Sequence, residues 1–197
     1  MKRLINILAF VAIMIFGTGC TDVQPFDFVL PLEIEPVFTI TDDDGVWAEF
    51  TVITYDDVAD AVDELEDDID FDDISIEGVT LIVDNPDPAL TGVENVILEL
   101  VDPSNQEFVI FDNVAITIPA GQDRTEVVVT SLAQEGILAL KDLLEGYVLS
   151  ESFENFSLVT SGRSTPQGTP LDMELTVVLH MSINYSQDLE VPYFLGN

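Results

Sequence analysis

Basic residues are scarce in this 197-residue chain, which has five Lys and Arg against 38 Asp and Glu and a formal charge of −33 at pH 7. Nucleic-acid binding depends on clustered Lys and Arg side chains that contact phosphates. Outside the N-terminus the basic residues are Arg124, Lys141 and Arg163, which are scattered along the sequence. We therefore expect no nucleic-acid partner, and a heavily solvated acidic surface that an anionic membrane would repel.

Histidine and cysteine each occur once, at His180 and Cys20. A histidine-based zinc site or a Ser-His-Asp triad would depend on His180 alone, and alternation places this residue on the polar side of a strand. The sequence also has no glycine-rich phosphate loop and no nucleophile elbow. We therefore predict that the protein is not an enzyme and has no organic cofactor.

The first twenty residues combine the basic pair Lys2 and Arg3 with a 13-residue apolar run, Leu4–Phe16. This run is typical of a secretory signal and is too short to cross a bilayer. The following Gly17-Thr18-Gly19-Cys20 resembles the lipobox of bacterial lipoproteins, although Gly17 stands where that family prefers an aliphatic residue. The resemblance implies a signal peptide over residues 1–19 and acyl chains such as palmitate on Cys20.

An acylated Cys20 implies a lipoprotein held on the bacterial cell envelope by its lipid. The next residue is Thr21 rather than Asp, which in enteric bacteria permits passage to the outer membrane. Prolines at positions 25, 31 and 36 indicate a tether over residues 20–36. The remaining residues, 37–197, are expected to form one domain, because 47% of the chain is apolar and supplies a core for an ordinary domain.

Alternation of apolar and polar residues predicts a protein made mainly of strands. The longest alternation runs from Leu171 to Tyr185, with an apolar residue at every second position. A change of phase at Gly78 indicates a β-bulge within another strand. The other expected strands cover residues 46–54, 73–83, 93–101, 107–111, 114–118, 125–130 and 153–161.

Two segments have helical periodicity instead. One covers residues 58–65 and is capped by Asp56 or Asp57, and the other runs from Leu132 to Leu144, capped by Ser131 and ended at Gly146. Short strands separated by turn residues at close spacing are typical of a sandwich. The predicted fold is therefore an immunoglobulin-like antiparallel β-sandwich with two short amphipathic helices.

Residues 79–162 resemble the late-embryogenesis-abundant type 2 domain, which is an immunoglobulin-like sandwich. The shared features are a strand that ends in Asn85-Pro86, the segment Ile118-Pro119-Ala120 before the strand Val127–Val129, a helix, and a strand that reaches Gly162. This resemblance covers about 40% of the chain. The whole chain is also similar to uncharacterised β-sandwich lipoproteins of Bacteroidetes-type bacteria, and neither family implies catalytic residues.

Acidic loops are the candidate metal sites, because calcium takes six to eight oxygen ligands. The candidate ligands lack the regular spacing of an EF-hand, so solvated loops are the competing interpretation. The residues concerned are Asp42, Asp43, Asp44, Asp68, Asp70 and Asp72.

Together these patterns predict a lipid-anchored, non-enzymatic envelope lipoprotein with a structural or binding role. Its expected partners are the membrane, through Cys20, and an envelope protein or an apolar ligand. Two alternatives stay open. One is a carrier of lipid or another apolar ligand, and the other is a glycan hydrolase that uses a pair of carboxylates, which the sequence does not single out.

Overall fold

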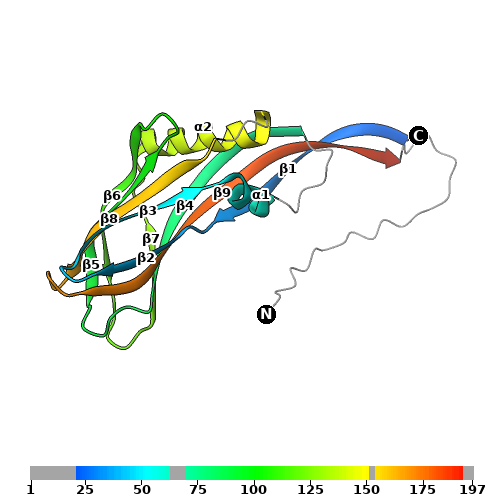
Figure 1. The fold of residues 1–197 in the computed structure, drawn as a ribbon. Helices are drawn as coiled ribbons and strands as arrows, with labels where there is room; N and C mark the ends of the chain where they lie inside the picture. Colours follow the sequence, from blue (N-terminus) through cyan, green and yellow to red (C-terminus); the bar gives the residue numbers. More distant parts are fainter. Residues whose placement is uncertain (1–20, 63–69, 151–153, 193–197) are drawn as a thin grey trace. The chain divides into compact units, whose positions relative to one another are not determined.

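The computed structural model of the chain describes residues 21–62, 70–150 and 154–192. Asp27–Gln187 form the larger of two compact units, and this unit is the antiparallel sandwich described below (Figure 1). The predicted fold class, mainly β with two short helices, is confirmed. Within the described residues, no helix is long and apolar enough to cross a membrane.

The first sheet is built around β9, the last strand that the structure describes. Its strands follow the order β1-β9-β4-β7, and β2 also pairs with β9. The predicted alternation in β9 is confirmed, because its odd-numbered residues from Leu171 to Ile183 are buried. The strands are β1 (Thr21–Ile34), β2 (Val37–Asp42), β4 (Asp70–Asp84), β7 (Arg124–Val129) and β9 (Leu171–Pro192).

The predicted bulge in β4 is also confirmed. The pairing of β4 with β9 shifts between Ile76 and Gly78, so Glu77 is the extra residue. Such an insertion reverses the side of the sheet to which the following residues point. This explains why Ile74 is buried before the bulge and Val79 after it.

The second sheet has the strand order β3-β8-β5-β6. We expected two strands between residues 107 and 118, but β6 is continuous across Asp112 and Asn113. Asn113 has a φ of 54°, and the pairing with β5 shifts nearby, so this part of the strand is irregular without being interrupted. The strands are β3 (Val46–Ile53), β5 (Gly92–Val101), β6 (Glu107–Thr117) and β8 (Phe156–Thr165).

Helix α1 (Tyr55–Val62) follows β3, and its cap differs from the prediction. Thr54 occupies the capping position, while Asp57 accepts hydrogen bonds from the backbone N–H and the hydroxyl of Thr54, each at 2.7 Å. Asp57 therefore stabilises the helix from its first turn rather than from the residue before it.

Helix α2 (Gln134–Ser150) contacts β4, β5 and β6, so it packs on strands of both sheets. It begins two residues later than predicted. The N–H of Ile137 donates to the carbonyl of Ala133, which places Ala133 rather than Ser131 at the cap. The helix also continues through Gly146, where we expected it to end.

The expected tether over residues 20–36 is mostly strand. Leu32 and Ile34 of β1 are buried, and these residues belong to the sandwich. The prolines suggested an irregular segment, but β1 lies at the edge of its sheet, where Pro31 can lack an N–H without breaking a ladder. Strand β9 likewise continues beyond Tyr185, where the predicted alternation ends, up to Pro192.

Candidate binding site

A groove opens at one side of the sandwich, between the β1–β2 junction and the end of β3. Its volume is about 400 Å³, which is within the range of small ligand sites. Apolar side chains and carboxylates share its wall. The lining residues are Glu33, Ile34, Glu35, Pro36, Val37, Thr51, Val52, Ile53 and Asp57.

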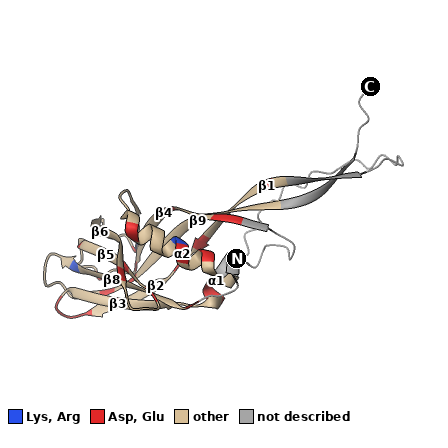
Figure 2. Ribbon diagram, turned by 90° about the horizontal axis from the view of Figure 1, so that it is seen from above, with Lys and Arg blue, Asp and Glu red and all other residues tan. Residues whose placement is uncertain are grey.

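The groove is acidic, because three of its lining residues are carboxylates and none is Lys or Arg. Two of these carboxylates have described partners: Asp57 holds Thr54, and Glu33 Oε1 lies 2.9 Å from Nδ1 of His180. Figure 2 shows acidic residues on both sheets and both helices, whereas basic residues are sparse. The charge around the groove therefore favours a cationic ligand.

An apolar strip on β3 borders the groove. The even-numbered residues of this strand are exposed, with Phe50 at 69% and Val52 at 44%, whereas Trp47 and Ile53 on the other side are buried. We call the four exposed residues the β3 strip: Val46, Ala48, Phe50 and Val52. A large exposed aromatic ring beside a groove is the kind of apolar surface that marks an interaction site.

At the residues of the β3 strip, the backbone N–H and C=O groups also point away from the neighbouring strand β8. Ser164 donates its N–H to the carbonyl of Gly45 at 2.7 Å, and the two residues continue the β3–β8 register. Because bonded and non-bonded pairs alternate in an antiparallel ladder, odd-numbered residues of β3 bond to β8 and even-numbered residues point away from it. The N–H of Val46 agrees with this pattern, since it donates to Asp42 Oδ1.

Within the described residues, β3 pairs only with β8. The strand is therefore an edge of its sheet, and the backbone N–H and C=O groups of Ala48, Phe50 and Val52 are directed away from β8. An edge with unpaired backbone groups is a template for an additional strand.

His180 lies on the polar side of β9, as predicted, and links three strands. Its Nδ1 is 2.9 Å from Glu33 Oε1 on β1, and its Nε2 is 2.8 Å from Thr80 Oγ1 on β4. The order carboxylate, imidazole, hydroxyl is that of a nucleophilic triad. Thr80 is only 5% exposed and does not line the groove, so this arrangement serves to join strands across the sheet.

The residues predicted for calcium lie in different elements where the structure describes them. Asp42 Oδ1 accepts hydrogen bonds from the N–H groups of Asp44 and Val46, so this carboxylate holds the turn between β2 and β3. Asp70 and Asp72 lie in strand β4, and Asp68 is outside the described residues. No described group of three His, Cys, Asp or Glu residues has the arrangement to hold a metal ion.

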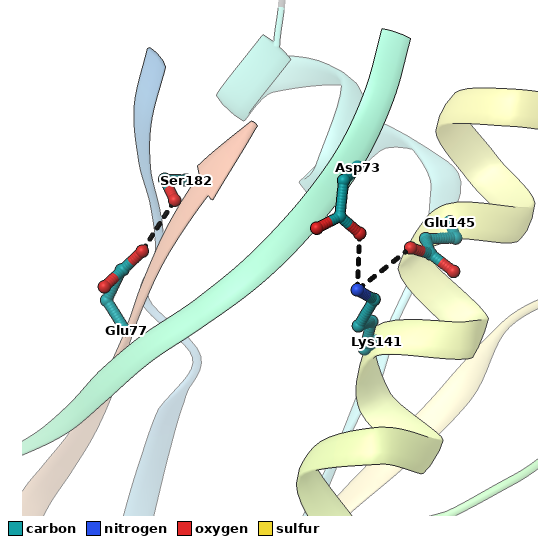
Figure 3. Close-up of polar contacts among 5 residues, drawn as sticks. All are labelled: Asp73, Glu77, Lys141, Glu145 and Ser182. Carbon is teal, nitrogen blue, oxygen red and sulfur yellow. Dashed lines mark hydrogen bonds and ion pairs between the residues drawn. The ribbon is translucent and has the colours of Figure 1, made fainter. Parts of the chain in front are cut away.

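A separate ion-pair cluster joins α2 to the first sheet. Lys141 on α2 contacts Asp73 on β4, and its Nζ lies 3.4 Å from Glu145 Oε1. Figure 3 shows these contacts, together with the hydrogen bond that Ser182 donates to Glu77. The hydrogen bond from Lys141 holds the pKa of the Asp73 carboxyl below its ordinary value, and the same bond raises the pKa of Lys141. This cluster is structural rather than part of the groove.

Neither a protein-family model nor a curated protein matches the sequence. Among solved structures, the chain is similar to that of Desmodium yellow mottle tymovirus at 12% identity and a TM-score of 0.33, over 94% of this chain and 97% of the other. For turnip yellow mosaic virus the values are 13% and 0.27, over 100% and 95%. These scores carry no argument about function.

Proposed function

We propose that this chain is a lipid-anchored, non-enzymatic binding module of the bacterial cell envelope. Acyl chains on Cys20 attach it to the membrane, and the groove with the β3 strip receives an envelope protein. The lipobox-like sequence supports the anchor. The observation that carries the binding role is the β3 strip, where Phe50 is 69% exposed beside a groove of about 400 Å³.

Exposure of the strip is costly unless something covers it. Water around apolar side chains is unfavourable by roughly 25 cal/mol for each Å². The facing sides of the two sheets, by contrast, are packed with buried aliphatic residues such as Leu81, Leu98 and Leu179. A partner that covers Phe50 and Val52 would remove this cost.

The anchor is tested by fractionating cells that express Cys20→Ser. We expect the wild-type chain in the membrane fraction and the variant released from it, with Thr21→Ser as a matched control that stays membrane-bound. A Cys20→Ser chain that remained fully in the membrane would rule out the lipid anchor.

The binding role is tested by placing a photo-crosslinking amino acid at position 50 in living cells. A discrete adduct is expected there and not at position 128, an exposed valine on the first sheet that serves as the control. Equal labelling at both positions, or none at either, would remove the site from consideration.

A carrier of lipid or another apolar ligand is the second candidate, because Ile34, Val37 and Val52 line the groove. Native mass spectrometry of the purified protein distinguishes it: a bound lipid that is lost in Val52→Asp supports a carrier. Protein free of lipid that still crosslinks at position 50 supports the binding module. The hydrolase alternative receives less support, since Asp57 and Glu33 are already engaged by Thr54 and His180.

A further inference from the structure

Among the described residues, no strand pairs with the side of β3 that faces away from β8. Val46 is already bonded to Asp42, so the available stretch is residues 48–52. Ala48, Phe50 and Val52 each direct a backbone N–H and C=O toward the open side, as the β3–β8 register requires. Those groups match the repeat of an added β-strand, which places hydrogen bonds at every second residue.

We propose that an extended segment of a basic partner protein adds to the edge of β3 as a fifth strand of the second sheet. The proposal deepens the proposed function, on which it rests, because it names the class of partner that the groove and the β3 strip receive. Strand addition takes affinity from main-chain hydrogen bonds and specificity from alternate side chains.

The charges along this edge select the sign of the partner. Glu49 is half-buried on the inner side of β3, and Glu35 and Asp57 line the groove. The nearest basic side chain on the second sheet, Arg163, is paired with Glu94 at 2.9 Å. A cationic segment that pairs with β3 would therefore lie near these carboxylates, and no Lys or Arg of the groove lining neutralises them.

A second copy of the chain does not fit this description. Each copy has a formal charge of −33 and only five basic residues, so pairing two β3 edges would place like charges against each other. Such repulsion is strong within a Debye length of about 8 Å at physiological ionic strength. The charge thus favours a basic partner over self-association.

The alternation of side chains further defines the partner. In an added strand, one set of side chains lies on the outer face beside Phe50 and Val52, and the other set points to the inner side, toward Glu49 and the groove. The first set is matched by apolar residues and the second by Lys or Arg. The expected sequence is therefore an alternation of apolar and basic residues over about five positions.

The probe is an acetylated and amidated peptide of four Val-Lys repeats, added to the full chain in detergent. We expect fluorescence anisotropy to show binding, and amide hydrogen exchange to become slower at Ala48, Phe50 and Val52. A peptide of four Val-Glu repeats, and one with the same Val and Lys residues in two blocks, should bind on the order of tenfold more weakly or worse.

The matched variants change one backbone donor on each sheet. Ala48→Pro removes an outward N–H from β3, and Val128→Pro removes an outward N–H from β7, both at exposed positions. Ala48→Pro should weaken peptide binding on the order of tenfold, whereas Val128→Pro should leave it unchanged. Circular dichroism confirms that both variants are folded, and Phe50→Lys is the substitute if Ala48→Pro is not.

Three results would overturn the inference: equal binding of the Val-Glu peptide, binding that is insensitive to Ala48→Pro and Phe50→Lys, or a concentration-dependent dimer that protects the β3 amides without peptide. If a crosslink forms at position 50 in cells but the Val-Lys peptide does not bind, the binding module stands and the basic-strand partner is wrong. If neither occurs, both proposals fail.

Discussion

The edges of β3 and β7 have the same backbone arrangement but differ in the charge of their side chains. Asn85 donates its N–H to the carbonyl of Asp123, and the β4–β7 register then directs the even-numbered residues of β7 outward, as on β3. On β7 these residues are Arg124, Glu126 and Val128, whereas β3 presents the apolar β3 strip. Arg124 is moreover paired with Asp84 at 2.9 Å.

Charged side chains on an edge discourage unintended strand pairing. A third edge, β6, is protected differently: Ala133, at the start of α2, donates its N–H to the carbonyl of Ile110. The molecule therefore protects β7 with charge and β6 with a covering segment. The apolar edge of β3 differs from both, and this difference supports the proposal that a partner binds there.

The largest difference in the free energy of unfolding should be between substitutions on the two sides of β3. Trp47→Ala should lower the free energy of unfolding by about 3–5 kcal/mol, because it leaves a large cavity in the core. Phe50→Ala should change it by no more than about 0.5 kcal/mol, because Phe50 is mostly in water. Urea unfolding followed by circular dichroism measures both values.

Gly162 supplies the control for the buried side. A Cβ atom at this position would lie 2.3 Å from the indole of Trp47. Gly162→Ala should therefore destabilise the fold by about 1–3 kcal/mol through overpacking. Similar losses for Phe50→Ala and Trp47→Ala would show that the β3 strip is packed and not free for a partner.

Converting β7 into an apolar edge like β3 should change the stoichiometry of peptide binding. In the double variant Arg124→Val and Glu126→Phe, the outward residues of β7 become apolar, and a second strand can add there. Isothermal titration with the Val-Lys peptide should then give a stoichiometry near two instead of one. A stoichiometry that stays at one would mean that the groove beside β3, and not the edge alone, determines binding.

Removal of the ion pair between Lys141 and Asp73 should have the smallest effect on stability, and this effect depends on pH. Asp73 has a lowered pKa, so its contribution is present above the unfolded value of 3.8 and is lost as pH falls through the folded value. Lys141 has a raised pKa, so its contribution is present below 10.5 and is lost as pH rises through its folded value.

Lys141→Met should therefore lower Tm slightly between about pH 5 and 9, and the two proteins should converge in stronger acid and base. Differential scanning calorimetry across this range measures the difference, with Lys141→Arg as the variant that keeps the charge. If the same difference in Tm persisted at pH 2, the effect would come from packing of the Lys141 stem and not from the ion pair.

The strands were predictable from the sequence because their periodicity is strong. The alternation of β9 and the change of phase at Gly78 correspond directly to a buried face and a bulge in the structure. Residues that commonly end strands and helices predicted the boundaries less well. The Asp112–Asn113 pair does not end β6, and Gly146 does not end α2. Packing against neighbouring elements outweighs local propensity at these positions.

The exposed apolar edge of β3 could not be located from the sequence. Both phases of β3 contain large apolar residues, Trp47 and Ile53 on one and Phe50 and Val52 on the other, so alternation alone does not show which phase is buried. Nor does it show that β3 is an edge. The partners of His180 are similarly 100 and 147 positions away, and only strand order brings them together.

The order of strands also determines when the sandwich can form. The last two strands that the structure describes are central ones: β8 separates β3 from β5, and β9 separates β1 and β2 from β4. Val37, near the start, finds its partner only at Thr176. Strand pairs between such distant segments form slowly, because the entropy of closing a long loop must be lost before the contacts form. During synthesis, both sheets thus remain divided until residues 156–187 have been made, so the sandwich cannot form before β8 and β9 are available.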